Sequence, residues 1–162
     1  MKKAALVFLV VLALAALAAA QNKISATAQC AKPEKDFKID VGDRPGHGFG
    51  IAQGKCTWTK GEIAGIQVKE EVWTGSGEAS GNTVRARWAN LLTMANGEKV
   101  YGRGDGAMTL KDGAPQTEEG KWTWTGGAGK FKGIKGKGTY KCKFAADGTG
   151  ACEMEGEYEP PK

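Results

Sequence analysis

The sequence beyond residue 20 lacks any long segment in which apolar residues recur at helical spacing, and it lacks a second apolar run long enough to cross a membrane. The first absence argues against helical bundles and α/β folds, whose helices carry an apolar stripe. The second predicts no membrane span in the mature chain, since a span takes about 20 apolar residues. The chain is instead rich in glycine, threonine and tryptophan, and its turn signals recur roughly every ten residues, which indicates an all-β sandwich or barrel.

Histidine and the common catalytic motifs are also scarce. His47 is the only histidine, and the four cysteines include no C-x-x-C pair, so we predict no metal site. There is no G-x-S-x-G elbow and no recognisable carboxylate pair, and no motif indicates a cofactor. His47 stands between two glycines without a visible partner, and we expect it to be solvated.

A strong excess of one charge is absent as well. The formal net charge is +5, and it falls to +3 (5 − 2) when Lys2 and Lys3 are removed with the N-terminal segment. Nucleic-acid-binding domains usually carry a marked basic stripe. This mild excess therefore predicts no nucleic-acid partner.

Residues 1–20 have the pattern of a signal peptide. Lys2 and Lys3 precede an apolar run over 4–17, and three alanines at 18–20 supply a cleavage site. The alternative, a membrane anchor, is disfavoured because the run is short and no basic cluster follows it. Gln21, not cysteine, follows the cleavage site, so we predict no lipoprotein. We expect a secreted or periplasmic protein with one domain over 21–162.

Eight candidate strands can be placed between the turn signals. A meander of eight antiparallel strands can close into a barrel whose interior is filled by side chains or by one small ligand. An open sandwich is the competing architecture. We expect 32–48 to form a loop or an edge segment, and turns at 60–61, 75–77, 96–97 and 111–115. The expected strands are 24–30, 49–58, 66–74, 83–94, 99–110, 118–125, 136–145 and 150–158.

The last two strands predict a stapled hairpin. A turn at Asp147-Gly148 places Cys142 opposite Cys152, and the same register sets Lys141 against Glu153 and Lys137 against Glu157. Facing opposite charges favour one register. We therefore predict a Cys142–Cys152 disulfide, which leaves Cys30 to pair with Cys56.

The glycine-rich stretch 126–138 does not fit a phosphate loop. Trp124 stands where a P-loop needs its first glycine, and Phe131 follows the lysine where Ser or Thr is required. The dinucleotide-binding spacing fails too. Glycines also permit the bend of a strand at a barrel corner. We expect such a corner here, with Phe131 and Ile134 closing the end of the core.

The run Gly-Gly-x-Gly-x-Phe-x-Gly-x-x-Gly over 126–136 resembles the corner motif of allene oxide cyclase-like barrels and of plant dirigent proteins. Small exported bacterial proteins of unknown function are similar to the chain as well, in the stretches 47–50, 93–97 and 155–158. Ala128 stands where the cyclase and dirigent families usually have threonine. The resemblance implies an eight-stranded, calycin-like up-and-down barrel, and it assigns no catalytic residue.

A few polar or aromatic side chains are candidates for a site. Glu70 shares its parity with Ile66, Val68 and Val72, so it is a candidate buried acid, although a bulge that leaves it solvated is the more ordinary alternative. Arg85 and Arg87 lie on one face of their strand and are candidates for binding a carboxylate, or else form a solvated face. Trp88 and Tyr101 complete the ligand-binding candidates.

Three functions are compatible with these patterns. The first is a non-enzymatic barrel that binds a small apolar or amphipathic ligand in its interior or mouth. The second is an isomerase or cyclase that holds a reactive intermediate inside the barrel and uses Glu70 or a nearby tyrosine. The third is a structural or partner-binding envelope protein, which a packed interior combined with an exposed aromatic patch would favour.

Overall fold

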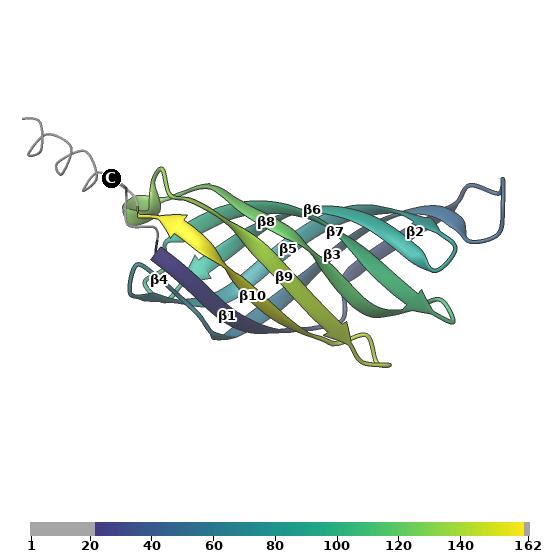
Figure 1. Cartoon of the computed structure of the whole chain (residues 1–162), viewed down its shortest axis with the longest axis horizontal. Helices are drawn as coiled ribbons and strands as arrows, with labels where there is room; N and C mark the ends of the chain where they lie inside the picture. The colour runs from purple at the N-terminus through teal and green to yellow at the C-terminus, as the bar shows by residue number, and fades with distance from the viewer. Residues whose placement is uncertain (1–21, 161–162) are drawn as a thin grey trace, which may run out of the picture.

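The computed structural model describes residues 22–160, which form an elongated, twisted antiparallel β-barrel (Figure 1). The predicted signal peptide at 1–20 lies outside the described residues. The strands are β1 (Asn22–Cys30), β2 (Lys35–Asp40), β3 (His47–Lys60), β4 (Glu62–Ile63), β5 (Ile66–Ser80), β6 (Thr83–Met94), β7 (Lys99–Lys111), β8 (Ala114–Gly127), β9 (Lys135–Phe144) and β10 (Gly150–Glu159), with a 3₁₀ turn η1 (Gly129–Phe131) before β9.

Eight of these strands close the barrel in up-and-down order. β5 to β10 pair consecutively, β1 lies between β10 and β3, and β3 pairs with β5 to complete the ring. The predicted eight-stranded antiparallel barrel is confirmed, and the open sandwich is excluded. Closure removes the free edges from the ring, which is the usual reason that such meanders close.

β2 is an additional strand at one end of the barrel. It pairs with 48–53 of β3, whereas β1 pairs with 56–60 of the same strand, so β2 takes the place beside β3 that β1 leaves after Cys30. The expected loop or edge segment at 32–48 is thus an edge strand in its centre. Beyond Cys30 the wall is open, because β2 pairs with β3 alone among the described strands.

The expected turn at 75–77 is wrong, because β5 runs straight through it to Ser80. Gly75 and Gly77 face inward, and a Cβ there would lie 3.2 Å from Cβ of Trp88 and 2.8 Å from Cγ1 of Val84. These glycines accommodate neighbours on β6 instead of reversing the chain. The reversal comes at Gly81, which has φ +59°.

The expected turn at 96–97 is confirmed. The N–H of Met94 donates to the carbonyl of Glu98 at 2.9 Å, and Gly97 takes φ +84°, a value that glycine adopts without strain. The glycine corner also behaves as predicted. Phe131 and Ile134 are both 0% exposed and close one end of the core.

The barrel interior is filled by interlocking aromatic rings and glycines. Trp122 and Trp124 point inward from β8, with ring centroids 4.9 Å apart. Gly138 and Gly156 lie across from Trp122, and any side chain on either glycine would overlap its ring. Alternation of large and small inward residues fills a small barrel to normal protein density.

Both disulfides form as predicted. Cys142 faces Cys152 across the β9–β10 hairpin, and Lys137 Nζ lies 3.2 Å from Glu157 Oε1 in the same register. Cys30–Cys56 joins β1 to β3 at the point where the barrel opens. Two disulfides indicate an oxidising compartment.

Candidate functional site

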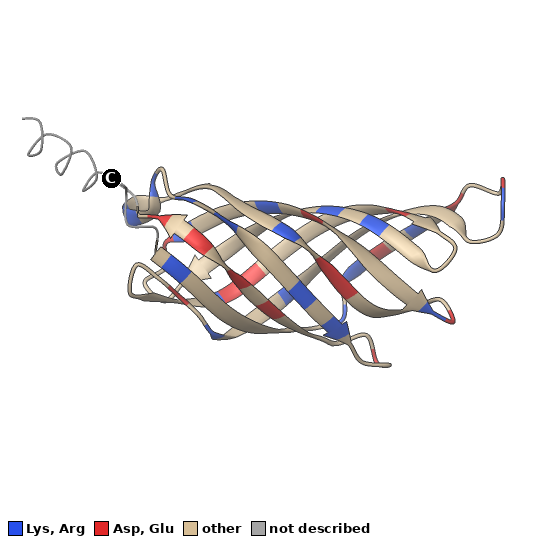
Figure 2. Ribbon diagram, in the orientation of Figure 1, with Lys and Arg blue, Asp and Glu red and all other residues tan. Residues whose placement is uncertain are grey.

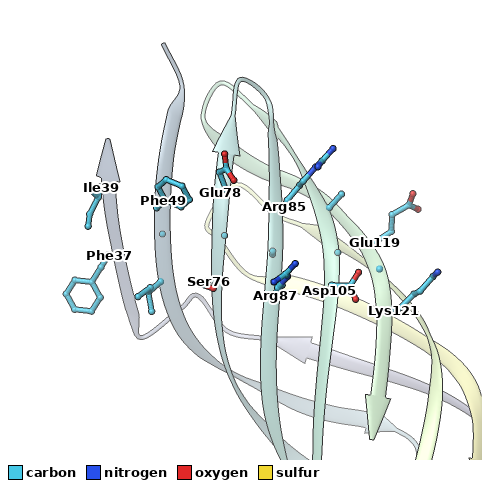
Figure 3. A pocket seen from close by; sticks show the side chains of 17 residues that line it. Phe37, Ile39, Phe49, Ser76, Glu78, Arg85, Arg87, Asp105, Glu119 and Lys121 are labelled. Carbon is cyan, nitrogen blue, oxygen red and sulfur yellow. The ribbon is translucent and has the colours of Figure 1, made fainter. Parts of the chain in front are cut away.

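A wide, shallow concavity of about 920 Å³ lies on the outer face of the sheet at the open end (Figure 3). It spans β2, β3, β5, β6, β7 and β8, and its large side chains occupy the outward positions of these strands. Its floor is backbone and small residues, for example Gly50, Gly77 and Gly106. We call this region the outer concavity.

One end of the outer concavity is apolar. Phe37 and Ile39 of β2 face Ile51 and Phe49 of β3 as cross-strand pairs. All four side chains are more than half exposed, at 66%, 70%, 58% and 51% respectively. These four residues form the apolar patch. A contiguous exposed group of this kind marks an interaction site, whereas single exposed apolar residues do not.

The other end of the outer concavity carries charges of both signs. Glu78 faces Arg85 across β5 and β6, and Asp105 of β7 faces Arg87 on one side and Lys121 on the other. Figure 2 shows Lys and Arg interspersed with Asp and Glu along the wall. The field here is therefore mixed, and it offers local partners for a polar group of either sign.

His47 lies beside the outer concavity, at the start of β3 and two residues before Phe49. Its Nδ1 lies 2.5 Å from Asp43 Oδ1, its Nε2 lies 3.2 Å from Glu78 Oε1, and its ring lies 5.8 Å from that of Phe49. The bond to Asp43 raises the pKa of His47 above 6.5 and lowers the pKa of Asp43. The expectation of a solvated, unpartnered histidine is wrong: the side chain is 10% exposed. Asp43 is four residues away in the loop, and Glu78 is brought close only by β3–β5 pairing.

Glu70 points outward and is exposed, so it is not the buried acid that strand parity made it a candidate for. The β5–β6 register shifts between Val68 and Glu70, and this bulge transfers the inward position to Glu71. The alternative of a bulge with a solvated Glu70 describes the structure. Strict alternation from Val68 predicts that Glu70 faces inward, because alternation carries no information about bulges. The residue that does face inward is Glu71.

Glu71 is the buried acid of the barrel. Trp58 Nε1 donates to its Oε2 at 3.0 Å, and Asn90 Nδ2 donates to its Oε1 at 2.6 Å. Burial raises the pKa of Glu71 above 4.5, and the two hydrogen bonds partly oppose that rise. Among the described residues, Asn90 Oδ1 is buried without a partner.

A second acid, Glu118, lies on the inner face of β8. The hydroxyl of Tyr140 donates to Glu118 Oε1 at 2.6 Å and accepts from Trp88 Nε1 at 3.1 Å. Burial raises the pKa values of both Glu118 and Tyr140. Sequence reasoning missed Glu118, although it shares its parity with Trp122 and so could have been found by extending the alternation of β8 towards its start.

The predicted ligand-binding residues divide between two locations. Arg85 and Arg87 are exposed and line the outer concavity. Trp88 instead packs inside, in edge contact with Tyr140 at 5.6 Å between ring centroids. Tyr101 is 41% exposed on the outer face of β7, outside the residues that line the outer concavity.

Around its tryptophans the barrel interior has little free volume. A void of about 10 Å³ remains between Trp58, Trp88 and Trp122, next to Asn90. A single water needs roughly 10–15 Å³ by the same kind of measure. The alternating glycines of β7 leave no space for a ligand either, because the rings of Trp88 and Tyr140 occupy it.

Within residues 22–160, no three His, Cys, Asp or Glu side chains are grouped to hold a metal ion. The described part of the chain also contains no helix long and apolar enough to span a bilayer. No protein-family model matches the chain, and no curated protein matches it in sequence. The geometry of the outer concavity is therefore the basis for a functional assignment.

Proposed function

We propose that this protein is an exported, non-catalytic binding protein that takes an amphipathic ligand in the outer concavity. The observation that carries the proposal is the apolar patch, four large side chains more than half exposed at one end of a depression of about 920 Å³. Keeping such side chains in water costs about 25 cal/mol for each Å² of apolar surface. A ligand that covers them recovers that free energy.

The polar end of the same concavity supports an amphipathic ligand over a purely apolar one. Arg85 and Arg87 project from β6 with their guanidinium groups exposed (Figure 3). An arginine can hold a carboxylate or phosphate through two parallel hydrogen bonds. An apolar tail on Phe49 and Ile51 would place a headgroup towards these arginines, because β5 is the only strand between β3 and β6.

The filled interior argues against chemistry or ligand binding inside the barrel. Glu71 and Glu118 are the acids best suited to proton transfer by their raised pKa values. Both are already hydrogen-bonded to protein side chains, and the adjacent void of about 10 Å³ admits no substrate. We therefore propose that the likeness to allene oxide cyclase-like barrels concerns architecture and not reaction.

Export fits the same proposal. The two disulfides accord with an oxidising compartment, and the pattern at 1–20 supports secretion or periplasmic delivery. An exported binder needs no cofactor, and its surface must collect ligand from dilute solution. The mixed charges around the apolar patch keep that surface soluble between binding events.

The test is to titrate the mature protein with dodecanoate, and separately with a nonionic dodecyl glycoside. Binding is monitored by the NMR signals of the backbone amides and the indole N–H groups. We expect shifts at Phe49 and Ile51, and none at the buried indole of Trp122. Phe49→Lys should weaken both probes about tenfold, in line with the loss of one buried aromatic contact.

Two further variants test the geometry. Arg87→Gln should weaken dodecanoate several-fold and leave the nonionic probe unchanged, because only the anionic headgroup uses the guanidinium. Tyr101→Lys is the matched control, an exposed aromatic outside the outer concavity that should leave both probes unaffected. Shifts confined to Trp122, or equal affinity for Phe49→Lys and the unmodified protein, would show that the ligand does not bind in the outer concavity.

A further inference from the structure

β2 presents an open strand edge. It contacts β3 and no other element of the described chain, and it stands at the end of the strand order (Figure 3). Eight strands close into a ring, and the other end of the strand order, β4, is only two residues long, so β2 is the one extended strand with an open edge among the described residues. Its sequence, Lys-Asp-Phe-Lys-Ile-Asp over 35–40, alternates apolar and charged residues in its second half.

The unpaired backbone groups of this edge can be identified from the ladder. The N–H of Val41 donates to the carbonyl of His47 at 3.0 Å. Val41 and His47 continue the β2–β3 register two residues beyond the pair Ile39–Phe49. Hydrogen bonding alternates along an antiparallel strand, so the odd-numbered residues bond towards β3. Lys38 and Asp40 therefore direct their backbone N–H and C=O groups away from β3.

The side chains of the edge are self-complementary about Ile39. In an antiparallel pair of two copies centred on that residue, Ile39 faces Ile39, and Phe37 faces Val41. On the opposite face Lys38 of each copy faces Asp40 of the other. Phe37, Ile39 and Val41 are 66%, 70% and 44% exposed, so the strand holds an apolar row that nothing in residues 22–160 of one chain covers.

We propose that β2 pairs with β2 of a second copy, antiparallel and centred on Ile39, to give a symmetric dimer with one continuous sheet. The dimer joins the apolar patches of the two copies on one face. The pairing satisfies the free backbone groups of Lys38 and Asp40, which lie at the hydrogen-bonded positions of this register. It does not depend on the ligand proposed for the outer concavity, because it uses the strand edge and the ligand uses the face.

The neighbouring registers are less complementary. Centring the pair on Lys38 sets Lys38 against Lys38 and Asp36 against Asp40. Centring it on Phe37 joins Asp36 to Lys38 but sets Glu34 against Asp40 and Lys35 against Ile39. Like charges directly opposite each other are destabilising, so the register centred on Ile39 is selected.

Charge reversal tests this register, with the dimer dissociation constant measured by analytical ultracentrifugation. Lys38→Asp and Asp40→Lys should each weaken the dimer on the order of tenfold or more, since each turns two attractive pairs into repulsive ones. The double variant should restore the affinity. Asp36 is unsuitable as a control, because its Oδ2 lies 3.3 Å from Lys38 Nζ within one chain. Lys143→Asp is the matched control: it reverses an exposed lysine on β9, which does not contact β2, and should leave the dimer intact.

A cysteine cross-link gives a second readout that does not depend on affinity. Ile39→Cys lies on the two-fold axis at a non-hydrogen-bonded pair, like Cys30–Cys56 with its Cα atoms 3.9 Å apart, and should form a covalent dimer on mild oxidation. Phe49→Cys, on the same face of the next strand, should not. Three results would overturn the proposal: a monomer at every concentration, a dimer indifferent to Lys38→Asp, or equal weakening by Lys38→Asp and Lys143→Asp. If the unmodified protein forms the dimer but does not bind dodecanoate, that result would count against the proposed function and not against the dimer.

Discussion

Glu71→Gln should stabilise the barrel at neutral pH, although it removes a carboxylate that accepts two hydrogen bonds. The glutamine oxygen can accept from Trp58 Nε1, which now donates to Glu71 at 3.0 Å. Its amide nitrogen can donate to Asn90 Oδ1 once the Asn90 amide turns over. Asn90 Oδ1 has no partner in the described structure, and after the amide turns over Asn90 Nδ2 takes its unpaired position. The number of unpaired buried atoms therefore stays the same.

The size of the effect follows from proton linkage. Burial raises the folded-state pKa of Glu71 above 4.5, so the folded protein holds this proton more tightly than the unfolded chain does. The associated stability is complete below pH 4.5 and is lost as pH rises through the folded-state pKa. Each pKa unit of elevation corresponds to about 1.4 kcal/mol of free energy of unfolding lost at high pH.

The assay is urea unfolding monitored by tryptophan fluorescence at a series of pH values from 4 to 8. This series covers the pH range in which a carboxyl group with a raised pKa titrates. The advantage of Glu71→Gln over the unmodified protein should be near zero at the acid end and should grow with pH. Glu71→Ala should instead lose about 2–6 kcal/mol at pH 4, because two buried donors then lack an acceptor. Its deficit relative to the unmodified protein should shrink as pH rises, because alanine does not titrate.

The neighbouring residue provides the control. Glu70→Gln changes an exposed side chain one position away and should leave the pH profile unaltered. If Glu71→Gln destabilises the protein by the same amount at every pH, Glu71 is ionised in the barrel with an ordinary pKa. That result would refute the argument from burial.

Three further predictions concern other parts of the fold. Gly120→Ala should cost about 1–3 kcal/mol or more in thermal unfolding, because its Cβ would overlap the backbone carbonyl of Asp105 and would lie 2.6 Å from Cα of Gly106. Gly50→Ala meets nothing closer than 3.4 Å and should change stability little. The single histidine can be titrated directly by NMR, and its pKa should exceed 6.5 and should fall in Asp43→Asn. The ion pairs of protonated His47 should order the 41–46 loop below pH 6.5, and this order should be lost as pH rises through the folded-state pKa. An unchanged His47 pKa in Asp43→Asn would contradict the contact between the two side chains. Replacing both cysteines of the β9–β10 hairpin by serine should lower the free energy of unfolding by about 3 kcal/mol according to the loop-closure model. Removing the β1–β3 disulfide should cost roughly 1 kcal/mol more, because that disulfide closes a longer loop. Equal losses in the two variants would argue against the loop-closure model for this protein.

Local rules predicted the parts of the chain whose partners are near in sequence. The β9–β10 hairpin is the clearest case, because alternation, opposite charges and two cysteines agree on one register across a short turn. The corner at 126–138 was predictable for the same reason, since Phe131 and Ile134 follow the glycines directly. Alternation failed at β5, where a bulge exchanges Glu70 for Glu71, and where glycines that look like a turn make room for Trp88 and Val84.

The candidate site was largely beyond the reach of the sequence. Arg85 and Arg87 were identifiable as one face of a strand, but their neighbours in the outer concavity come from β2, β3 and β5. The same holds for the two acid networks, since Trp58, Glu71 and Asn90 meet only when β3, β5 and β6 are paired. The order of neighbouring strands follows from the meander, but the side chains that meet depend on the register of β3 against β5 and on the bulge in β5, and no local pattern encodes either.

The sequence by itself determined the all-β class, the strand count of the ring and the Cys142–Cys152 disulfide, because these follow from alternation, turn residues and short-range register. The Cys30–Cys56 disulfide then followed because no other cysteines remained. Only the tertiary structure decided that the interior is filled and that β2 stands outside the ring. Filling depends on the fit of glycines against tryptophan rings from distant strands, and the exposure of Phe37 and Ile39 depends on the end of β1 at Cys30. These two outcomes move the site from the inside of the barrel to its outer face.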